Sequence, residues 1–248
     1  MKKEIIILML TISLTNIFGQ TPNNKLEISH LTRDFYIYTT HNSYNGDLVS
    51  ANGMYLVTTE GVVLFDTPWD TSQFQPLLDS IKFRHDKKVI ICIATHFHKD
   101  RTAGLEYYKT RGISTYTTMQ TDEWCRKRNE KRAEYLMGND TIFKVGDYSF
   151  QTYYAGKGHS SDNIIIWFDK DKIIYGGCLV KSIEATDLGN IADGDVNEWS
   201  ATIRNIQKKF KRPNFIIPGH QSWTSIKSLD HTLNLIKQFK KENAPLRL

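Results

Sequence analysis

The most informative stretch of the sequence is Val89-Ile90-Ile91-Cys92-Ile93-Ala94-Thr95-His96-Phe97-His98-Lys99-Asp100-Arg101. Its first part, up to Ala94, is a continuous apolar run, which is typical of a strand covered on both faces. Two histidines at positions i and i+2 follow the run, and side chains at that spacing in an extended or turning segment can point the same way. The stretch therefore predicts a buried strand that carries potential metal ligands at its end.

The pattern His96-x-His98-x-Asp100 favours two adjacent metal sites. A carboxylate two residues beyond the second histidine reaches a neighbouring position rather than the same ion. The alternative is a pair of surface histidines with ordinary hydrogen-bond partners. Because the chain has only 8 histidines, a chance HxHxD has odds of roughly one in a hundred, which favours the metal interpretation.

On the N-terminal side of this stretch, a polar leader is followed by a pattern that predicts antiparallel β-structure and then one helix. We expect strands over 35–39, 54–58 and 62–66, turns at 44–47 and 60–61, and a helix over 74–81. The C-terminal side predicts a second β half with helices around it. We expect helix over 121–135, strands over 150–154, 163–168, 172–175 and 215–217, and helices over 198–210 and 228–241.

This β-then-α order, which occurs twice, predicts an α/β fold. We expect a four-layer sandwich of two mixed β-sheets with helices on the outside, although periodicity does not fix the strand order. The chain has 248 residues, a length typical of one large α/β domain with a buried core. A single domain over residues 20–248 is therefore expected.

The N-terminus has the pattern of a secretory signal peptide over residues 1–19. Met1-Lys2-Lys3 is a basic start, an apolar run over 5–14 follows, and Gly19-Gln20 is the expected cleavage zone. The alternatives are a first core helix or an uncleaved anchor, but the run is too short to span a bilayer comfortably. We expect a periplasmic protein without a membrane anchor.

Charge and cysteine content argue against a nucleic-acid partner and against a framework that pairs every cysteine in a disulfide. The formal net charge is +5, and the lysines and arginines are scattered rather than clustered, so no nucleic-acid partner is indicated. We expect a monomer. Cys92, Cys125 and Cys178 are an odd number without a paired framework spacing, so at least one needs a role other than a disulfide.

Three further motifs follow apolar strands or lie in glycine-bearing turns, where sites are commonly built. They are Gly158-His159-Ser160, Gly176-Gly177-Cys178 and Pro218-Gly219-His220. Each alone is a weak signal, because such a histidine is more often a hydrogen-bonded turn residue and such a cysteine a small buried hydrophobe. Together with HxHxD they supply four histidines, one aspartate and one cysteine, enough for two zinc ions with open positions for water.

In their order along the chain, these motifs resemble the metallo-β-lactamase superfamily and, in detail, its subclass B1 β-lactamases. The resemblance covers essentially the whole mature chain and includes residues 64–69, 158–163, 177–181 and 188–193. Most other hydrolases of the superfamily have a histidine after the motif aspartate and a bridging aspartate in place of the cysteine. Arg101 and Cys178 occupy those places here and favour a lactamase over a thioester or phosphoester hydrolase.

The resemblance implies two zinc ions per chain. His96, His98 and His159 would bind the first zinc, and Asp100, Cys178 and His220 the second. A zinc-bound hydroxide, formed because zinc lowers the pKa of bound water to about 7, would attack the lactam carbonyl. The second zinc would accept the charge on the ring nitrogen. Penicillins, cephalosporins and carbapenems are the implied substrates, with antibiotic resistance as the consequence. A secreted zinc-stabilised module is the rival, but structural zinc sites are normally closed.

The same resemblance implies that Asp100, Lys181 and Asn190 are catalytic, and that Lys181, Asn190 and Trp69 bind substrate. Lys181 would pair with the substrate carboxylate; its alternative is a solvated loop lysine. Asn190 would help hold the lactam carbonyl, with an ordinary turn-forming asparagine as the alternative. Trp69 would give the groove an apolar wall.

Asp66 and Arg101 match positions that would orient the metal ligands, and both have a plain structural alternative as buried polar groups. Residues 41–47 correspond to a hairpin that covers the groove in this family, and the stretch is more polar than in many relatives. Cys92 is expected in the core and Cys125 in a structural or incidental role. The remaining histidines, His30, His41, His85 and His231, are expected to be surface or structural residues.

Overall fold

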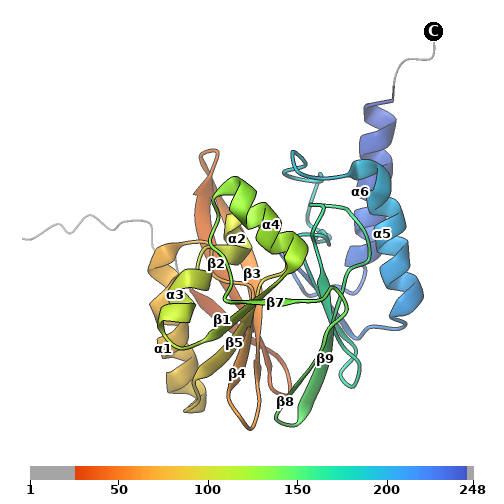
Figure 1. Cartoon of the computed structure of the whole chain (residues 1–248). Coiled ribbons are helices and arrows are strands. Elements are labelled where there is room, and N and C mark those ends of the chain that lie inside the picture. The colour runs from red at the N-terminus through yellow and green to blue at the C-terminus, as the bar shows by residue number, and fades with distance from the viewer. Residues whose placement is uncertain (1–25, 245–248) are drawn as a thin grey trace, which may run out of the picture.

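A computed structural model describes residues 26–244 of the chain as two β-sheets packed face to face, with helices on their outer sides (Figure 1). The seven-stranded sheet has the order β1-β2-β3-β4-β5-β6-β7, and the five-stranded sheet has the order β12-β11-β10-β9-β8. Each sheet contains parallel and antiparallel neighbours, so the predicted four-layer sandwich of mixed sheets is confirmed. The predicted signal peptide lies outside the described residues, and the domain limits 20–248 stay a prediction.

The first sheet begins antiparallel and continues parallel. Its strands are β1 (Glu27–Thr32), β2 (Phe35–Tyr44), β3 (Asp47–Val57), β4 (Val62–Phe65), β5 (Val89–Ile93), β6 (Ser114–Thr118) and β7 (Tyr135–Met137). The predicted turn between β2 and β3 is confirmed: Asn45 and Gly46 have φ values of 52° and 91°. Consecutive positive φ values favour asparagine and glycine, and they match the twist of a hairpin.

The second sheet is antiparallel except for its last pair. It consists of β8 (Ile142–Val145), β9 (Tyr148–Tyr153), β10 (Ile165–Phe168), β11 (Ile173–Gly177) and β12 (Phe215–Pro218). The parallel pair β11 and β12 is connected through α5 (Val196–Lys209), which covers the outer face together with α6 (Ser228–Glu242) (Figure 1). Both helices bury an apolar face that includes Trp199, Ile203 and Ile236. The two predicted helices and the strand between them are confirmed.

Four α-helices and one short 3-10 helix belong to the first half of the described chain. They are η1 (Thr71–Gln73), α1 (Phe74–His85), α2 (Lys99–Thr102), α3 (Leu105–Thr110) and α4 (Met119–Arg128). The predicted helix over 121–135 is wrong in its second half. Asn129 adopts a left-handed conformation (φ 55°), and the Glu130 N–H donates to the Cys125 carbonyl, which ends the helix after one C-cap residue.

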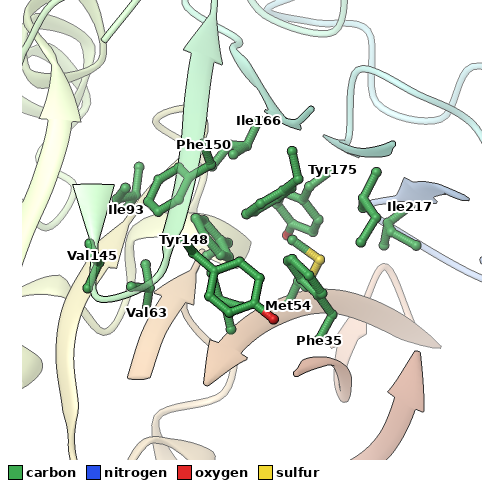
Figure 2. Packing of buried hydrophobic residues seen from close by; sticks show 14 of the residues in the cluster. Phe35, Met54, Val63, Ile93, Val145, Tyr148, Phe150, Ile166, Tyr175 and Ile217 are labelled. Carbon is green, nitrogen blue, oxygen red and sulfur yellow. The ribbon is translucent and has the colours of Figure 1, made fainter. Parts of the chain in front are cut away.

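The core between the sheets is rich in aromatic rings that meet edge to face (Figure 2). Phe35 and Phe168 have ring centroids 4.8 Å apart at 79°, and Phe65 and Phe150 have centroids 5.2 Å apart at 86°. Complete burial of such a side chain stabilises the fold by roughly 1.5–3 kcal/mol. The core therefore holds both sheets firmly and, with them, the strand ends that carry the site.

Several short strands had no clear signal in the sequence. The polar leader contains β1, which pairs with β2 at the edge of the first sheet, and β6 and β8 were not predicted either. Such strands are stabilised by pairing with neighbours rather than by their own periodicity. Among residues 26–244, none of the helices is both long and apolar enough to cross a membrane.

Candidate metal centre

The six predicted metal ligands come from loops or a helix start that follow the ends of strands. His96 and His98 lie in the loop between β5 and α2, and Asp100 lies in α2. His159 lies in the loop after β9, Cys178 directly after β11, and His220 shortly after β12. The structure brings all six together at one edge of the two sheets, in two adjoining sets.

The first set consists of three histidines. His98 Nδ1 lies 3.1 Å from His96 Nε2 and 3.0 Å from His159 Nε2. The other ring nitrogen of His98 donates to Asp193 Oδ2 at 3.2 Å, which leaves Nδ1 with a lone pair that points at its two neighbours. In a tetrahedral zinc site, Zn–N bonds of about 2.0–2.1 Å separate two nitrogens by roughly 3.3 Å. The donor spacing is close to that separation.

The second set combines a carboxylate, a thiol and an imidazole. Cys178 Sγ lies 3.3 Å from Asp100 Oδ2 and 3.2 Å from His220 Nε2, and the latter two atoms are 3.3 Å apart. The other nitrogen of His220 donates to the Ser50 carbonyl at 2.6 Å, so Nε2 is left to face the set. Oxygen, sulfur and nitrogen in this spacing suit a second zinc ion.

The two sets adjoin. Ligand atoms of His96, Asp100 and Cys178 lie within 4.8 Å of one another, so one residue of the first set is in reach of two residues of the second. Each set provides three protein ligands, which leaves a coordination position open for water or substrate. The donor chemistry of the site therefore fits two neighbouring catalytic zinc ions.

The charge states of the ligands suit a cation as well. Burial holds the pKa values of His96 and His159 well below their usual range, so both rings are neutral and have a free lone pair. Burial by itself would favour the neutral acid of Asp100, but the Arg101 guanidinium and His220 outweigh it and keep its pKa well below the usual range. Burial raises the pKa of the Cys178 thiol despite Arg101, so metal binding there has to release a proton.

Arg101 contacts two ligands of the second set and is only 1% exposed. Its Nη2 donates to Cys178 Sγ at 3.0 Å and lies 2.9 Å from Asp100 Oδ2. Its Nη1 donates to the Asn52 carbonyl at 2.6 Å and lies 3.3 Å from Asp66 Oδ2. A planar guanidinium with this many donors holds two of the ligands in a fixed relation.

Asp66 connects the two halves of the molecule. Its carboxylate accepts from the Thr95 N–H at 2.7 Å, just after β5 of the first sheet, and from the Tyr175 hydroxyl at 2.6 Å, in β11 of the second sheet. Burial raises its pKa to about 6, although Arg101, Tyr175 and Thr95 all favour the ionised form. Asp66 itself has a left-handed backbone (φ 63°), which is uncommon for a residue other than glycine. Its hydrogen bond with the Thr95 N–H holds the segment that leads into His96.

Four of the six ligands, His98, Asp100, His159 and His220, line a groove of about 980 Å³. Trp69, Lys181, Asn190 and the β2–β3 hairpin line it as well. Lys181 is 9% exposed, and its ammonium lies 5.5 Å from the centre of the Trp199 ring, so it is not a solvated loop lysine. Burial lowers its pKa, and Cys178 and Asp100 oppose that shift. The Asn190 side chain accepts from the Ala192 N–H at 3.1 Å, which is the contact expected of a turn-forming asparagine. Asn190 also lines the groove.

Several residues of the centre were absent from the sequence-based prediction. Tyr175 and Thr95 hold Asp66, Asn52 accepts from Arg101, and Arg128 forms an ion pair with Asp193. Asp193 stood in a matched motif, but no role was assigned to it. Three of the four histidines predicted to be surface or structural residues form such hydrogen bonds: His30 with the Arg33 carbonyl, His85 with the Tyr55 hydroxyl and His231 with the Ala185 carbonyl.

Comparisons with known proteins agree with this geometry. A model of the metallo-beta-lactamase superfamily matches residues 46–220. The metallo-beta-lactamase type 2 of Elizabethkingia meningoseptica is 45% identical over 245 residues, 98% of this chain and 98% of that protein. Metallo-beta-lactamase IND-1 of Chryseobacterium indologenes is 37% identical, over 96% of this chain and 100% of that protein. The crystal structure of metallo-beta-lactamase IND-7 has a TM-score of 0.84 and 38% identity, over 88% of this chain and 100% of that one.

Proposed function

Because this chain belongs to the metallo-β-lactamase superfamily, and within it to subclass B1, we propose that it binds two zinc ions and opens the β-lactam ring of penicillins, cephalosporins and carbapenems. Zinc-dependent hydrolysis of β-lactams, with the antibiotic resistance that it confers, is the activity of a subclass B1 enzyme. The observation that carries the proposal is the pair of adjoining three-ligand sets, each of which contributes two residues to the lining of the groove.

We assign His96, His98 and His159 to the first zinc and Asp100, Cys178 and His220 to the second. Zinc held by these side chains supplies a water with a pKa of about 7 and a positive charge for an anion that forms during the reaction. Arg101 supports the ionised form of Asp100, which is what a metal ligand requires. The hydrogen bonds of His98 to Asp193 and of His220 to Ser50 fix which ring nitrogen each histidine offers.

Substrate positioning is assigned to Lys181, Asn190 and Trp69, which line the groove. The ammonium of Lys181 is nearly buried, and a buried charge is costly unless an opposite charge compensates it. A substrate carboxylate provides that charge. The Asn190 amide lies on the same loop and would contact the lactam carbonyl, and Trp69 would pack against apolar parts of the substrate.

The experiment that tests this function uses purified, zinc-loaded mature protein. Hydrolysis of a carbapenem, a cephalosporin and a thioester would be followed by absorbance under the same conditions. We expect both β-lactams to be hydrolysed much faster than the thioester, because Cys178 and Arg101 distinguish this site from those of thioester hydrolases. Preferential thioester hydrolysis would contradict the proposal and favour the general metallo-hydrolase instead.

We expect replacement of Lys181 by alanine to raise KM about 10-fold or more and to lower kcat less. A charge-assisted hydrogen bond of about 1.5–3 kcal/mol, made in the ground state and the transition state alike, changes KM at constant kcat. Steady-state kinetics on several carboxylate-bearing substrates would measure both constants.

Two variants separate charge from packing in that experiment. Lys181→Met keeps the aliphatic stem beside Trp199 and should show the same rise in KM as Lys181→Ala. Lys99→Ala removes another lysine that lines the groove and should leave KM nearly unchanged. An unchanged KM in both Lys181 variants would show that this lysine does not bind the carboxylate.

We also propose that the mature protein acts in the periplasm as a monomer. The support for its location is the basic and apolar pattern of residues 1–19. Cell fractionation and determination of the mature N-terminus would test the location, and light scattering of the purified protein would test the oligomeric state.

A further inference from the structure

Arg128, the last residue of α4, reaches the loop that carries the substrate-positioning residues. Its Nη2 forms an ion pair with Asp193 Oδ1, in the loop between β11 and α5. The second oxygen of the same carboxylate accepts from His98 Nε2 at 3.2 Å. One carboxylate thus bridges a guanidinium from α4 and an imidazole of the first ligand set.

A second line of contacts holds the guanidinium in place. The Arg128 guanidinium carbon lies 5.6 Å from the centre of the Trp124 ring, as expected for a cation–π contact. Trp124 stacks on Phe97 with centroids 5.4 Å apart at 22°, and the Phe97 and His98 rings are 4.4 Å apart. Arg128 is therefore anchored on the same aromatic group that packs against His98.

We propose that Arg128 is a positioning residue for the first zinc and acts through Asp193 on His98. The ion pair fixes the Asp193 carboxylate where it accepts the Nε2 proton, and that hydrogen bond selects the His98 tautomer with a free lone pair on Nδ1. This inference rests on the proposed function, because it takes His98 as a zinc ligand.

Arg128 is expected to orient the Asp193 carboxylate rather than to stabilise the fold. Arg128 is 49% exposed at its side chain, whereas Asp193 and His98 are each 16% exposed. A half-exposed ion pair adds little to folding stability. Without Arg128, however, the carboxylate is free to turn toward water, and the His98 proton then has to share its acceptor with solvent. The metal affinity should fall while the stability stays nearly constant.

The test measures zinc affinity by competition with a chromogenic chelator and stability by urea unfolding. A residue that contacts a zinc ligand directly, as Asp193 contacts His98, typically contributes about 10–100-fold to metal affinity. Because Arg128 acts on His98 only through Asp193, we expect Arg128→Ala to weaken zinc binding at the first site by roughly 3–10-fold. The urea midpoint should hardly move. Arg128→Lys keeps the charge and should recover part of the loss.

Lys127 offers a matched control on the same helix. Its ammonium also lies over the Trp124 ring, at 5.0 Å, but in the described chain the ion-pair partners of Asp193 are His98 and Arg128. Lys127→Ala should therefore leave zinc affinity unchanged. Cobalt titration assigns any loss to one site, since only the set with Cys178 gives a thiolate-to-metal charge-transfer band.

A double-mutant cycle with Asp193 decides whether the effect passes through that carboxylate. If it does, Arg128→Ala should cause no further loss of affinity in an Asp193→Ala background. The inference is overturned if Arg128→Ala has its full effect in that background, or if the single variant binds zinc as tightly as the wild type. A wild-type protein that binds no zinc would refute the proposed function itself, and this inference with it.

Discussion

We expect removal of zinc by a chelator to abolish β-lactam hydrolysis by this protein, and added zinc to restore it. We expect a loss of at least about 10³-fold, because the metal supplies both the activated water and the charge that stabilises the transition state, and enzymes commonly accelerate reactions by 10⁶-fold or more. Carbapenem hydrolysis would be followed by absorbance, and elemental analysis would give the zinc content of the same samples.

Two controls accompany the chelation experiment. Circular dichroism should show that the metal-free protein keeps its secondary structure, so that the loss is not due to unfolding. A compound that acylates catalytic serines should leave the zinc-loaded protein fully active, since no serine is assigned to the reaction. Full activity in protein shown to be free of metal would contradict the mechanism.

Replacement of Cys178 by alanine should leave a folded protein with about one zinc ion and a kcat lowered by roughly 10²–10³-fold, the effect typical of losing an electrostatic stabiliser. The thiol is one of the three donors of the second set, whereas the first set consists of histidines alone. The two sets differ in softness and charge, so the loss should be selective. Elemental analysis and steady-state kinetics would measure it.

Two further variants isolate the role of the Cys178 sulfur. Cys178→Ser keeps a hydrogen-bond acceptor for Arg101 but offers zinc a harder, neutral donor, so it should lose the second zinc as well. Cys92→Ala removes another buried cysteine, one that lies in β5, and should keep both zinc ions. Two tightly bound zinc ions with undiminished turnover in Cys178→Ala would show that the cysteine is misassigned.

Much of the fold could be predicted because strong local patterns agree with the tertiary structure. The apolar run before His96 forms β5, the Asn45-Gly46 turn joins β2 and β3, and α5 and α6 start within two residues of the predicted positions. These elements have a clear period or a residue type that a particular backbone conformation requires. Where such signals were weak, β1 was not predicted, and the second half of the predicted helix 121–135 was wrong.

The sequence alone also identified the six candidate ligands, and the structure brings them together in two sets. Histidine, aspartate and cysteine directly after apolar strands are a local signal, since a strand that ends at the sheet edge delivers the next residues to that edge. Their assignment to two zinc ions came from a family resemblance. The distances of 3.0–3.3 Å between neighbouring donors come from the tertiary structure.

The contacts that hold these ligands in place depend on the folded arrangement of the chain. Arg101 reaches Asn52 and Cys178, and Arg128 reaches His98 through Asp193, across separations that no local pattern encodes. The neutral state of His96 and the burial of Lys181 depend equally on what packs around them. Residue types and spacing determine which chemistry is available, whereas orientation and charge state depend on desolvation and on neighbours that only the folded chain brings together.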